Sequence, residues 1–87
     1  MSYLQADPDE LDRYANSLRE IATSITSEAK RARSGVSGLS RFRGKERDRL
    51  EQDVAEASRG IERSAKVLEQ HAQSLRTFSA RIRALRR

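Results

Sequence analysis

Two seven-residue apolar patterns, separated by a short stretch without one, constrain the fold of this 87-residue chain more than any other feature. Apolar residues that recur every seven positions lie on one side of an α-helix. One pattern fills the N-terminal half of the chain and the other fills the C-terminal half. The sequence therefore predicts two long amphipathic helices, at residues 8–38 and 46–85, within a single domain that spans residues 1–87.

The stretch between the two patterns, residues 39–45, predicts a chain reversal. It contains Phe42, one of two phenylalanines in the sequence, and Gly44, which can adopt the positive φ that a reversal often needs. Helices joined by so short a connection are usually antiparallel neighbours. We therefore expect an all-α antiparallel helical hairpin, and we expect Phe42 to pack on the ends of both helices and fix the corner.

The start of the first helix is marked by Asp7, Pro8 and Glu10. An aspartate can cap the exposed amide groups of a helix N-terminus, and proline suits the first helical position. A glutamate in the first turn favours the positive end of the helix dipole. The helix is therefore expected to begin at Pro8.

Each predicted helix carries a row of large apolar residues with a row of small residues beside it. We take the large residues as the main seam and the small ones as a flanking row that lets another helix approach closely. Hydrophobic and charged residues each make up 36% of the chain, and so small a chain does not build a normal core alone. Two hairpins pairing into a dimeric four-helix bundle satisfy both rows. The residues expected to pack at helix contacts are Leu11, Tyr14, Ala15, Leu18, Ile21, Ala22, Ile25, Ala29, Leu50, Val54, Ile61, Leu68, His71 and Leu75.

No group of residues predicts catalysis. His71 is the single histidine and there is no cysteine, so we expect a structural histidine hydrogen-bonded in the seam and neither a metal nor another cofactor. The sequence has no Gly-x-Ser-x-Gly elbow and no glycine-rich phosphate loop. Basic residues around the corner alternate with Glu46, Asp48 and Glu51, as on an ordinary solvated surface. An enzyme is therefore not expected.

The C-terminal end of the second helix is basic, with five arginines and no acid in residues 71–87. Counting back from the corner places Pro8 opposite residue 75, so later residues should overhang the first helix. Tyr3 and Leu4 can cover only part of that overhang. We therefore predict a partner-binding tail whose main residues are Phe78, Arg81, Ile82, Arg83 and Leu85.

The corner Phe42-Arg43-Gly44 between two long amphipathic helices resembles the Trp-x-Gly corner of the WXG (ESAT-like) family of small type VII secretion proteins. The opening of the first helix, residues 7–18, is also similar to that family. The resemblance implies a homodimeric or heterodimeric four-helix bundle, made in the cytoplasm and exported without a cleaved signal peptide. It further implies either a secreted substrate or the chaperone-like partner of one. Family members commonly carry a Tyr-x-x-x-Asp/Glu export signal after the second helix, and residues 71–87 contain no such motif.

A basic helical nucleic-acid-binding protein is the alternative interpretation, because phosphate contacts come from arginine and lysine. A basic helix end on an anionic membrane is a third. Basicity confined to the C-terminal end, with no interleaved aromatic residues, favours a protein partner over both nucleic acid and membrane. The N-terminus lacks a basic start and an apolar run, so a cleavable signal peptide is not expected.

Overall fold

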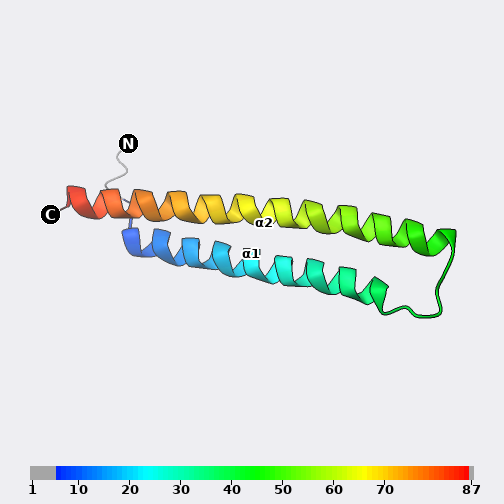
Figure 1. The fold of residues 1–87 in the computed structure, drawn as a ribbon. Coiled ribbons are helices and arrows are strands. Elements are labelled where there is room, and N and C mark those ends of the chain that lie inside the picture. The colour runs from blue at the N-terminus through cyan, green and yellow to red at the C-terminus, as the bar shows by residue number, and fades with distance from the viewer. Residues whose placement is uncertain (1–5, 87) are drawn as a thin grey trace.

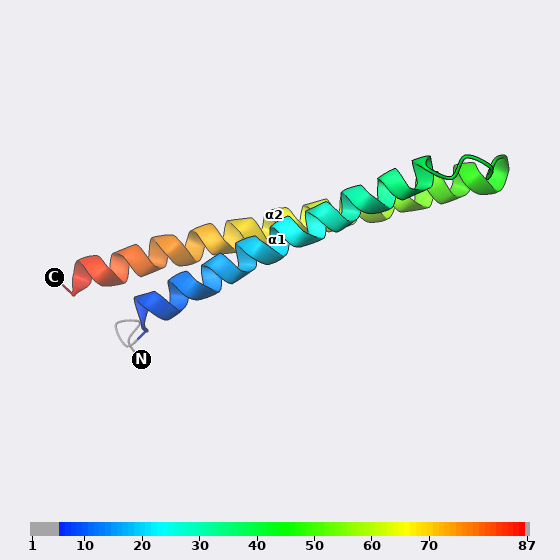
Figure 2. The same ribbon diagram turned by 90° about the horizontal axis from the view of Figure 1, so that it is seen from below.

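The computed structural model describes residues 6–86, which fold into an antiparallel pair of helices, α1 (Pro8–Ser37) and α2 (Lys45–Leu85), joined by residues 38–44 (Figure 1). The predicted all-α helical hairpin is therefore confirmed. Compared with the predicted bounds, α1 ends one residue earlier and α2 begins one residue earlier. The pair forms a rod of 65 × 18 × 15 Å in which the helices cross at a shallow angle (Figure 2).

Asp7 and Pro8 start α1 as the sequence indicates. The Asp7 carboxylate accepts a hydrogen bond of 2.9 Å from the backbone N–H of Asp9, and the Asp7 carbonyl accepts one from the N–H of Leu11. Pro8 occupies the first turn, where its missing N–H leaves no broken hydrogen bond. Asp9 and Glu10 add negative charge near the positive end of the helix dipole.

Gly44 makes the reversal into α2 possible. Its φ is +98° and its ψ is −163°, a conformation that residues with a side chain rarely adopt. Its carbonyl accepts a hydrogen bond from the N–H of Asp48, which begins the helix. A Cβ built at Gly44 meets nothing within 4 Å, so the backbone conformation and not a lack of space requires glycine here.

The corner is held by Arg47, whereas Phe42 does not anchor it as predicted. The Phe42 side chain is 37% exposed. The Arg47 guanidinium donates hydrogen bonds to the carbonyl oxygens of Leu39 (3.1 Å) and Phe42 (3.2 Å), and its Nε forms an ion pair with Glu51. A guanidinium provides several donors in one plane and so can connect two loop carbonyls to the first turns of α2.

Small residues, and not large apolar ones, form the contact between α1 and α2. On α2, the sequence analysis predicts the contact along the row of large apolar residues, whereas the structure has it along the neighbouring row of small residues. Helices that present small side chains to each other can bring their backbones close, and in an isolated hairpin this leaves the larger side chains beside the contact. The buried residues at seven-residue spacing are Ala15, Ala22, Ala29 and Val36 on α1 and Ser58, Ala65, Ala72 and Ser79 on α2.

Two hydroxyl groups fix the register of the helices. Ser58 Oγ donates a hydrogen bond of 3.2 Å to the carbonyl oxygen of Ala29, and Ser79 Oγ donates one of 3.1 Å to the carbonyl of Pro8. Both serines are fully buried, and each hydroxyl satisfies its donor on the backbone of the opposite helix. Pro8 therefore lies level with Ser79, one turn further along α2 than the predicted residue 75.

Candidate interaction surface

The residues that follow the small rows define two different faces of the hairpin. In a helix, a residue three positions after a row member lies to one side of the row, and a residue four positions after it lies to the other side. Because the helices are antiparallel, corresponding sides of the two helices meet on the same face of the hairpin. We call the first side the apolar face and the second side the ionic face. At the three-residue offset stand Leu11, Leu18, Ile25, Ala32, Ile61, Leu68, Leu75 and Ile82, whereas the four-residue offset holds Asp12, Arg19, Thr26, Arg33, Glu62, Glu69, Arg76 and Arg83.

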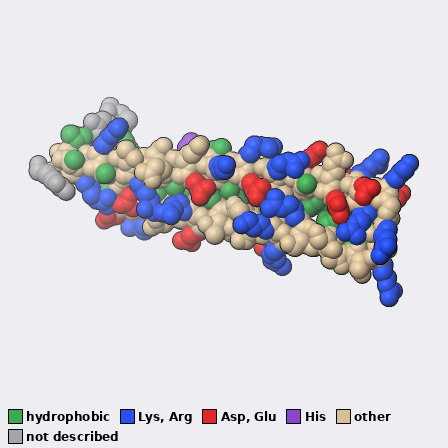
Figure 3. Space-filling model, in the orientation of Figure 1, with side chains coloured by type: hydrophobic (Ala, Val, Ile, Leu, Met, Phe, Trp, Pro, Cys, Tyr) green, Lys and Arg blue, Asp and Glu red, His purple; other side chains and the backbone are tan. Residues whose placement is uncertain are grey.

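The ionic face is closed by contacts between the helices. Arg33 and Glu62 form a two-point ion pair, with nitrogen–oxygen distances of 3.2 and 3.3 Å. Arg76 donates a hydrogen bond to the side-chain oxygen of Asn16. Charged side chains of both signs lie along the two helices in the view of Figure 3. This face satisfies much of its polarity inside the hairpin and leaves few large apolar groups open.

Arg83 joins the free ends of the two helices. Its guanidinium lies 2.7 Å from carboxylate oxygens of both Asp9 and Asp12, and it also donates to Ser79 Oγ. The hydrogen bond from Arg83 lowers the pKa of Asp12 below its usual value of 3.8. The same carboxylates, Asp12 first, raise the pKa of Arg83.

The apolar face, by contrast, is only partly covered. Leu18 is buried with Ala15 and Ala72, and Leu68 and Leu75 pack against that cluster from α2. Residues one position before each row member widen the face, and several of these are open to solvent. The large exposed side chains there are Tyr14 (59% exposed), Ile21 (48%), Ile61 (36%) and Leu85 (56%), beside half-buried Leu11, Ile25, Leu50, Val54 and Phe78.

A shallow hollow of about 520 Å³ interrupts the apolar face between the two helices. Its α1 side is formed by Ile25 and Glu28. On α2, small residues leave the space unfilled. The residues on the α2 side are Ala57, Gly60, Ile61 and Ser64. Larger apolar side chains stand next to this hollow, so the apolar face alternates between raised and recessed regions along its length.

The structure divides the residues predicted to pack into three groups. Ala15, Leu18, Ala22 and Ala29 are buried within the hairpin. Tyr14, Ile21, Ile61 and His71 are exposed, because the contact between α1 and α2 runs through the neighbouring small row. The expectation that His71 is hydrogen-bonded in the seam is wrong: among residues 6–86 no hydrogen bond to its side chain is present. The remaining predicted residues, Leu11, Ile25, Leu50, Val54, Leu68 and Leu75, are half-buried.

Two residues of the predicted partner-binding tail are engaged inside the hairpin. Ile82 is completely buried and Arg83 is paired with α1, so neither is available as predicted. The reason is that the overhang is shorter than expected, and Arg86 donates to the carbonyl of Ala6, which holds the segment before α1 against the last turn of α2. Exposed Arg81 and Leu85 and half-buried Phe78 remain, together with Ala84, around a hollow of about 420 Å³. Tyr3 and Leu4, the expected cover, lie outside the described residues.

The residues that sequence reasoning missed are polar groups that act between distant parts of the chain. Ser58 and Ser79 belong to the row of small residues beside the predicted seam of the second helix, and Arg47 is one of the basic residues around the corner that are expected to be solvated. The spacing of the two serines could have identified them as contact residues. Both continue the seven-residue row of Ala65 and Ala72, where a small side chain is required.

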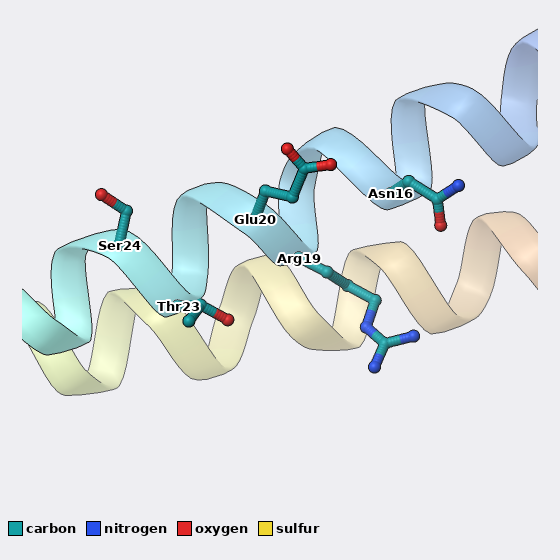
Figure 4. A pocket seen from close by; sticks show the side chains of 5 residues that line it. All are labelled: Asn16, Arg19, Glu20, Thr23 and Ser24. Atoms are coloured by element: carbon teal, nitrogen blue, oxygen red, sulfur yellow. The ribbon is translucent and has the colours of Figure 1, made fainter.

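Another hollow, of about 510 Å³, lies along one helix and has no features of a binding site. All of its residues, Asn16, Arg19, Glu20, Thr23 and Ser24, come from α1, and their side chains diverge instead of converging on one point (Figure 4). Within residues 6–86, no three histidine, cysteine or acidic side chains are grouped closely enough to hold a metal ion.

No helix in the described part of the chain is long and apolar enough to cross a bilayer. Comparisons with protein-family models, with curated proteins and with solved structures give no significant match.

Proposed function

We propose that this chain is a small dimerising helical hairpin of type VII secretion, either an exported substrate or the chaperone-like partner of one. The apolar face is the surface through which it pairs with a second helical hairpin. The observation that carries this proposal is the difference between the two faces: ion pairs close one, whereas large apolar side chains of both helices stay open on the other.

Pairing of two hairpins through this face supplies what the single hairpin lacks. A contiguous apolar stripe on a small protein usually marks a contact with another molecule, whereas single exposed apolar residues do not. Tyr14, Ile21 and Ile61 lie on such a stripe, and half-buried leucines connect them. Two stripes packed together form the common four-helix arrangement, with its core between the hairpins.

The assignment to type VII secretion is supported by the resemblance of the Phe42-Arg43-Gly44 corner and of the first helix to the WXG family. The positive φ of Gly44 gives a physical reason for a glycine at that corner position. Because residues 71–87 carry no Tyr-x-x-x-Asp/Glu motif, we propose that an associated hairpin supplies the export signal.

Sedimentation velocity over a wide concentration range tests the pairing. We expect the wild-type chain to dimerise, and Ile21→Glu to weaken dimerisation at least about tenfold, since a carboxylate would be buried in an apolar contact. Thr23→Glu adds the same charge to an exposed position of α1 on the other side of the small row, away from the apolar face, and should leave the dimer intact. A wild-type chain that stays monomeric at every concentration rejects the homodimer and restricts the proposal to a heterodimer with a related hairpin.

The secretion role has a separate test. The chain, alone or with hairpins encoded beside it, is produced in a bacterium with an intact type VII apparatus and in one lacking its ATPase. Appearance of the chain in the medium of the first strain only, or its co-purification with an exported hairpin, supports the proposal. Absence of both results contradicts it.

A further inference from the structure

Four cationic side chains without a partner lie together at the loop end of the rod, whereas three arginines near the C-terminus are bound inside the hairpin. At the C-terminal end, Arg76 and Arg83 are bound to α1 and Arg86 is bound to the backbone of Ala6. Many basic side chains project from the end of the rod that carries the loop (Figure 3). Arg81 stays exposed near the C-terminus, so the larger group of cations without a partner lies at the end opposite the predicted tail.

Four cationic side chains surround the loop without a partner. Arg41, Arg43, Lys45 and Arg49 are exposed, and within residues 6–86 none of them forms a side-chain hydrogen bond or an ion pair. Arg47 is excluded from this group because it is paired with Glu51 and holds the loop carbonyls. The acids of the first turn of α2, Glu46 and Asp48, offset two of the four charges, which leaves a net charge of +2.

Two large apolar side chains stand among these cations. Leu39 is 43% exposed and Phe42 is 37% exposed, and both line a hollow of about 510 Å³ with Gly38, Ser40 and Arg41. Their carbonyl oxygens are held by Arg47, so the loop presents these side chains from a fixed backbone. Residues 38–49 therefore combine two exposed apolar side chains with four exposed cations at one end of the rod, and we call this segment the tip.

We propose that the tip docks end-on to an anionic phospholipid surface. Leu39 and Phe42 enter the boundary between headgroups and acyl chains, and Arg41, Arg43, Lys45 and Arg49 contact the phosphates. Amphipathic protein surfaces bind membranes through this combination of shallow apolar burial and attraction to anionic lipid. The expectation of no membrane partner concerned the basic C-terminal end, where Arg76, Arg83 and Arg86 are bound inside the hairpin.

The shape of the tip favours a lipid surface over a protein partner. The rod is 18 × 15 Å across, so its end offers far less than the ~800 Å² per partner of a stable protein interface. A bilayer surface needs no matching shape, and a narrow convex end can enter it. Nucleic acid would use the cations, but the adjacent exposed Leu39 has no role in phosphate contacts.

The proposal does not rest on dimerisation or on secretion. The apolar face follows the length of the two helices, whereas the loop that carries the tip lies at the end of the rod (Figure 1). A side-by-side pair of hairpins therefore leaves each tip accessible. The membrane proposal can fail while the dimer is observed, and the reverse also holds.

Vesicle co-sedimentation of the full chain tests this inference. The probes are vesicles of phosphatidylcholine alone and vesicles that also contain phosphatidylglycerol. We expect binding to the anionic vesicles only, weakened by salt. A basic residue near an anionic surface strengthens binding about fivefold, so the loss of two cations that contact the lipid corresponds to about 25-fold.

Two variants and a matched control complete the test. The combined Arg41→Gln, Arg43→Gln, Lys45→Gln and Arg49→Gln variant should lose at least about tenfold in binding, since only charges within a Debye length of about 8 Å of the lipid count at physiological salt. The apolar variant Leu39→Ser with Phe42→Ser should lose binding without changing helicity by circular dichroism. The control removes four exposed cations away from the tip, Arg13, Arg59, Arg63 and Lys66, and should bind almost as wild type.

Several results would overturn the proposal. Equal binding to both kinds of vesicle, or none to either, removes the anionic-lipid site. Equal losses in the tip variant and in the control mean that overall charge, and not the tip, governs binding. Full binding by the apolar variant removes the insertion step. Stronger tip-dependent binding to a DNA duplex or oligonucleotide, added as a competitor, reassigns the cations to nucleic acid.

Discussion

The hydroxyl of Ser58 donates a hydrogen bond of 3.2 Å to the carbonyl oxygen of Ala29 on the opposite helix. A side chain as short as serine reaches the backbone of a neighbouring helix only where the two helices pack very closely. Ala29 is 1% exposed and Ser58 is 1% exposed, so the two residues exclude water from this contact. The relationship shows that the two helices approach each other closely along their small residues, with buried Leu18 and Ile82 adding apolar packing beside this contact.

Enlarging a small residue in this contact should destabilise the hairpin. Ala22 is 2% exposed in the row between Ala15 and Ala29. Ala22→Leu forces the helices apart, and overpacking of this kind costs about 1–3 kcal/mol. The free energy of unfolding, measured by urea titration with circular dichroism, should fall by that amount.

The matched control for this prediction is Ala80→Leu, the same change at an exposed position of α2. Its effect should stay within about 0.5 kcal/mol, as for most surface substitutions. Equal losses for the two variants would contradict the assignment of the small row to the helix contact.

At the corner, Arg47→Ala should destabilise the hairpin more than Phe42→Ala does. The Arg47 guanidinium donates to the carbonyls of Leu39 and Phe42, whereas the Phe42 ring is 37% exposed. Hydrogen bonds from charged groups contribute about 1.5–3 kcal/mol, and partial exposure of Arg47 places the expected loss near the lower limit. Arg43→Ala, at an exposed arginine of the same loop without a partner, serves as the control. A larger loss for Phe42→Ala in thermal unfolding would restore the aromatic-anchor hypothesis.

The hairpin could be predicted from the sequence because the residues that start the helices and reverse the chain act locally. Asp7 and Pro8 act within one turn of α1, and Gly44 acts through its own φ. The choice of seam was not local. Each helix carries two adjacent columns at seven-residue spacing, and the period alone does not tell which column faces the other helix and which stays open. In the isolated hairpin, the two helices meet along their rows of small residues. The rows of large apolar residues remain open to a further partner.

The candidate surface was predictable only in part for the same reason. Tyr14, Ile21 and Ile61 were predicted to pack at helix contacts, but within the hairpin they are exposed because the small residues occupy the seam. The contacts of Arg83 with Asp9 and Asp12 join residues more than 70 positions apart. Such contacts depend on the register between the helices, which a single sequence does not display.

At the free ends, Ile82 should contribute to folding, whereas Leu85 should not. Ile82 is 0% exposed and Leu85 is 56% exposed, although both belong to the apolar pattern of the predicted tail. Ile82→Ala should lower the free energy of unfolding toward the lower end of the ~2–5 kcal/mol typical of buried isoleucine. Leu85→Ala should change it by less than about 1 kcal/mol. Comparable losses in denaturant titrations would show that the end of α2 is not packed as described.

The ion pair between Arg83 and Asp12 should make the stability of the hairpin depend on acid. The pKa of Asp12 is lowered in the folded chain, chiefly by the hydrogen bond from Arg83. The folded state therefore binds this proton less readily than the unfolded state does. Its stabilising contribution is present at pH values above the usual 3.8 and is lost as the pH falls through the lower folded value.

Urea titrations at pH 5 and below pH 3 test this dependence. Asp12→Asn removes the titrating carboxylate and should reduce the difference in unfolding free energy between the two conditions, while lowering stability at pH 5. Asp53→Asn removes an exposed carboxylate that has no ion pair within the described residues, and it should retain the wild-type difference. If Asp12→Asn loses as much stability on acidification as the wild-type chain does, Asp12 is not a source of the acid sensitivity, and the Arg83 contact does not couple the helix ends to pH.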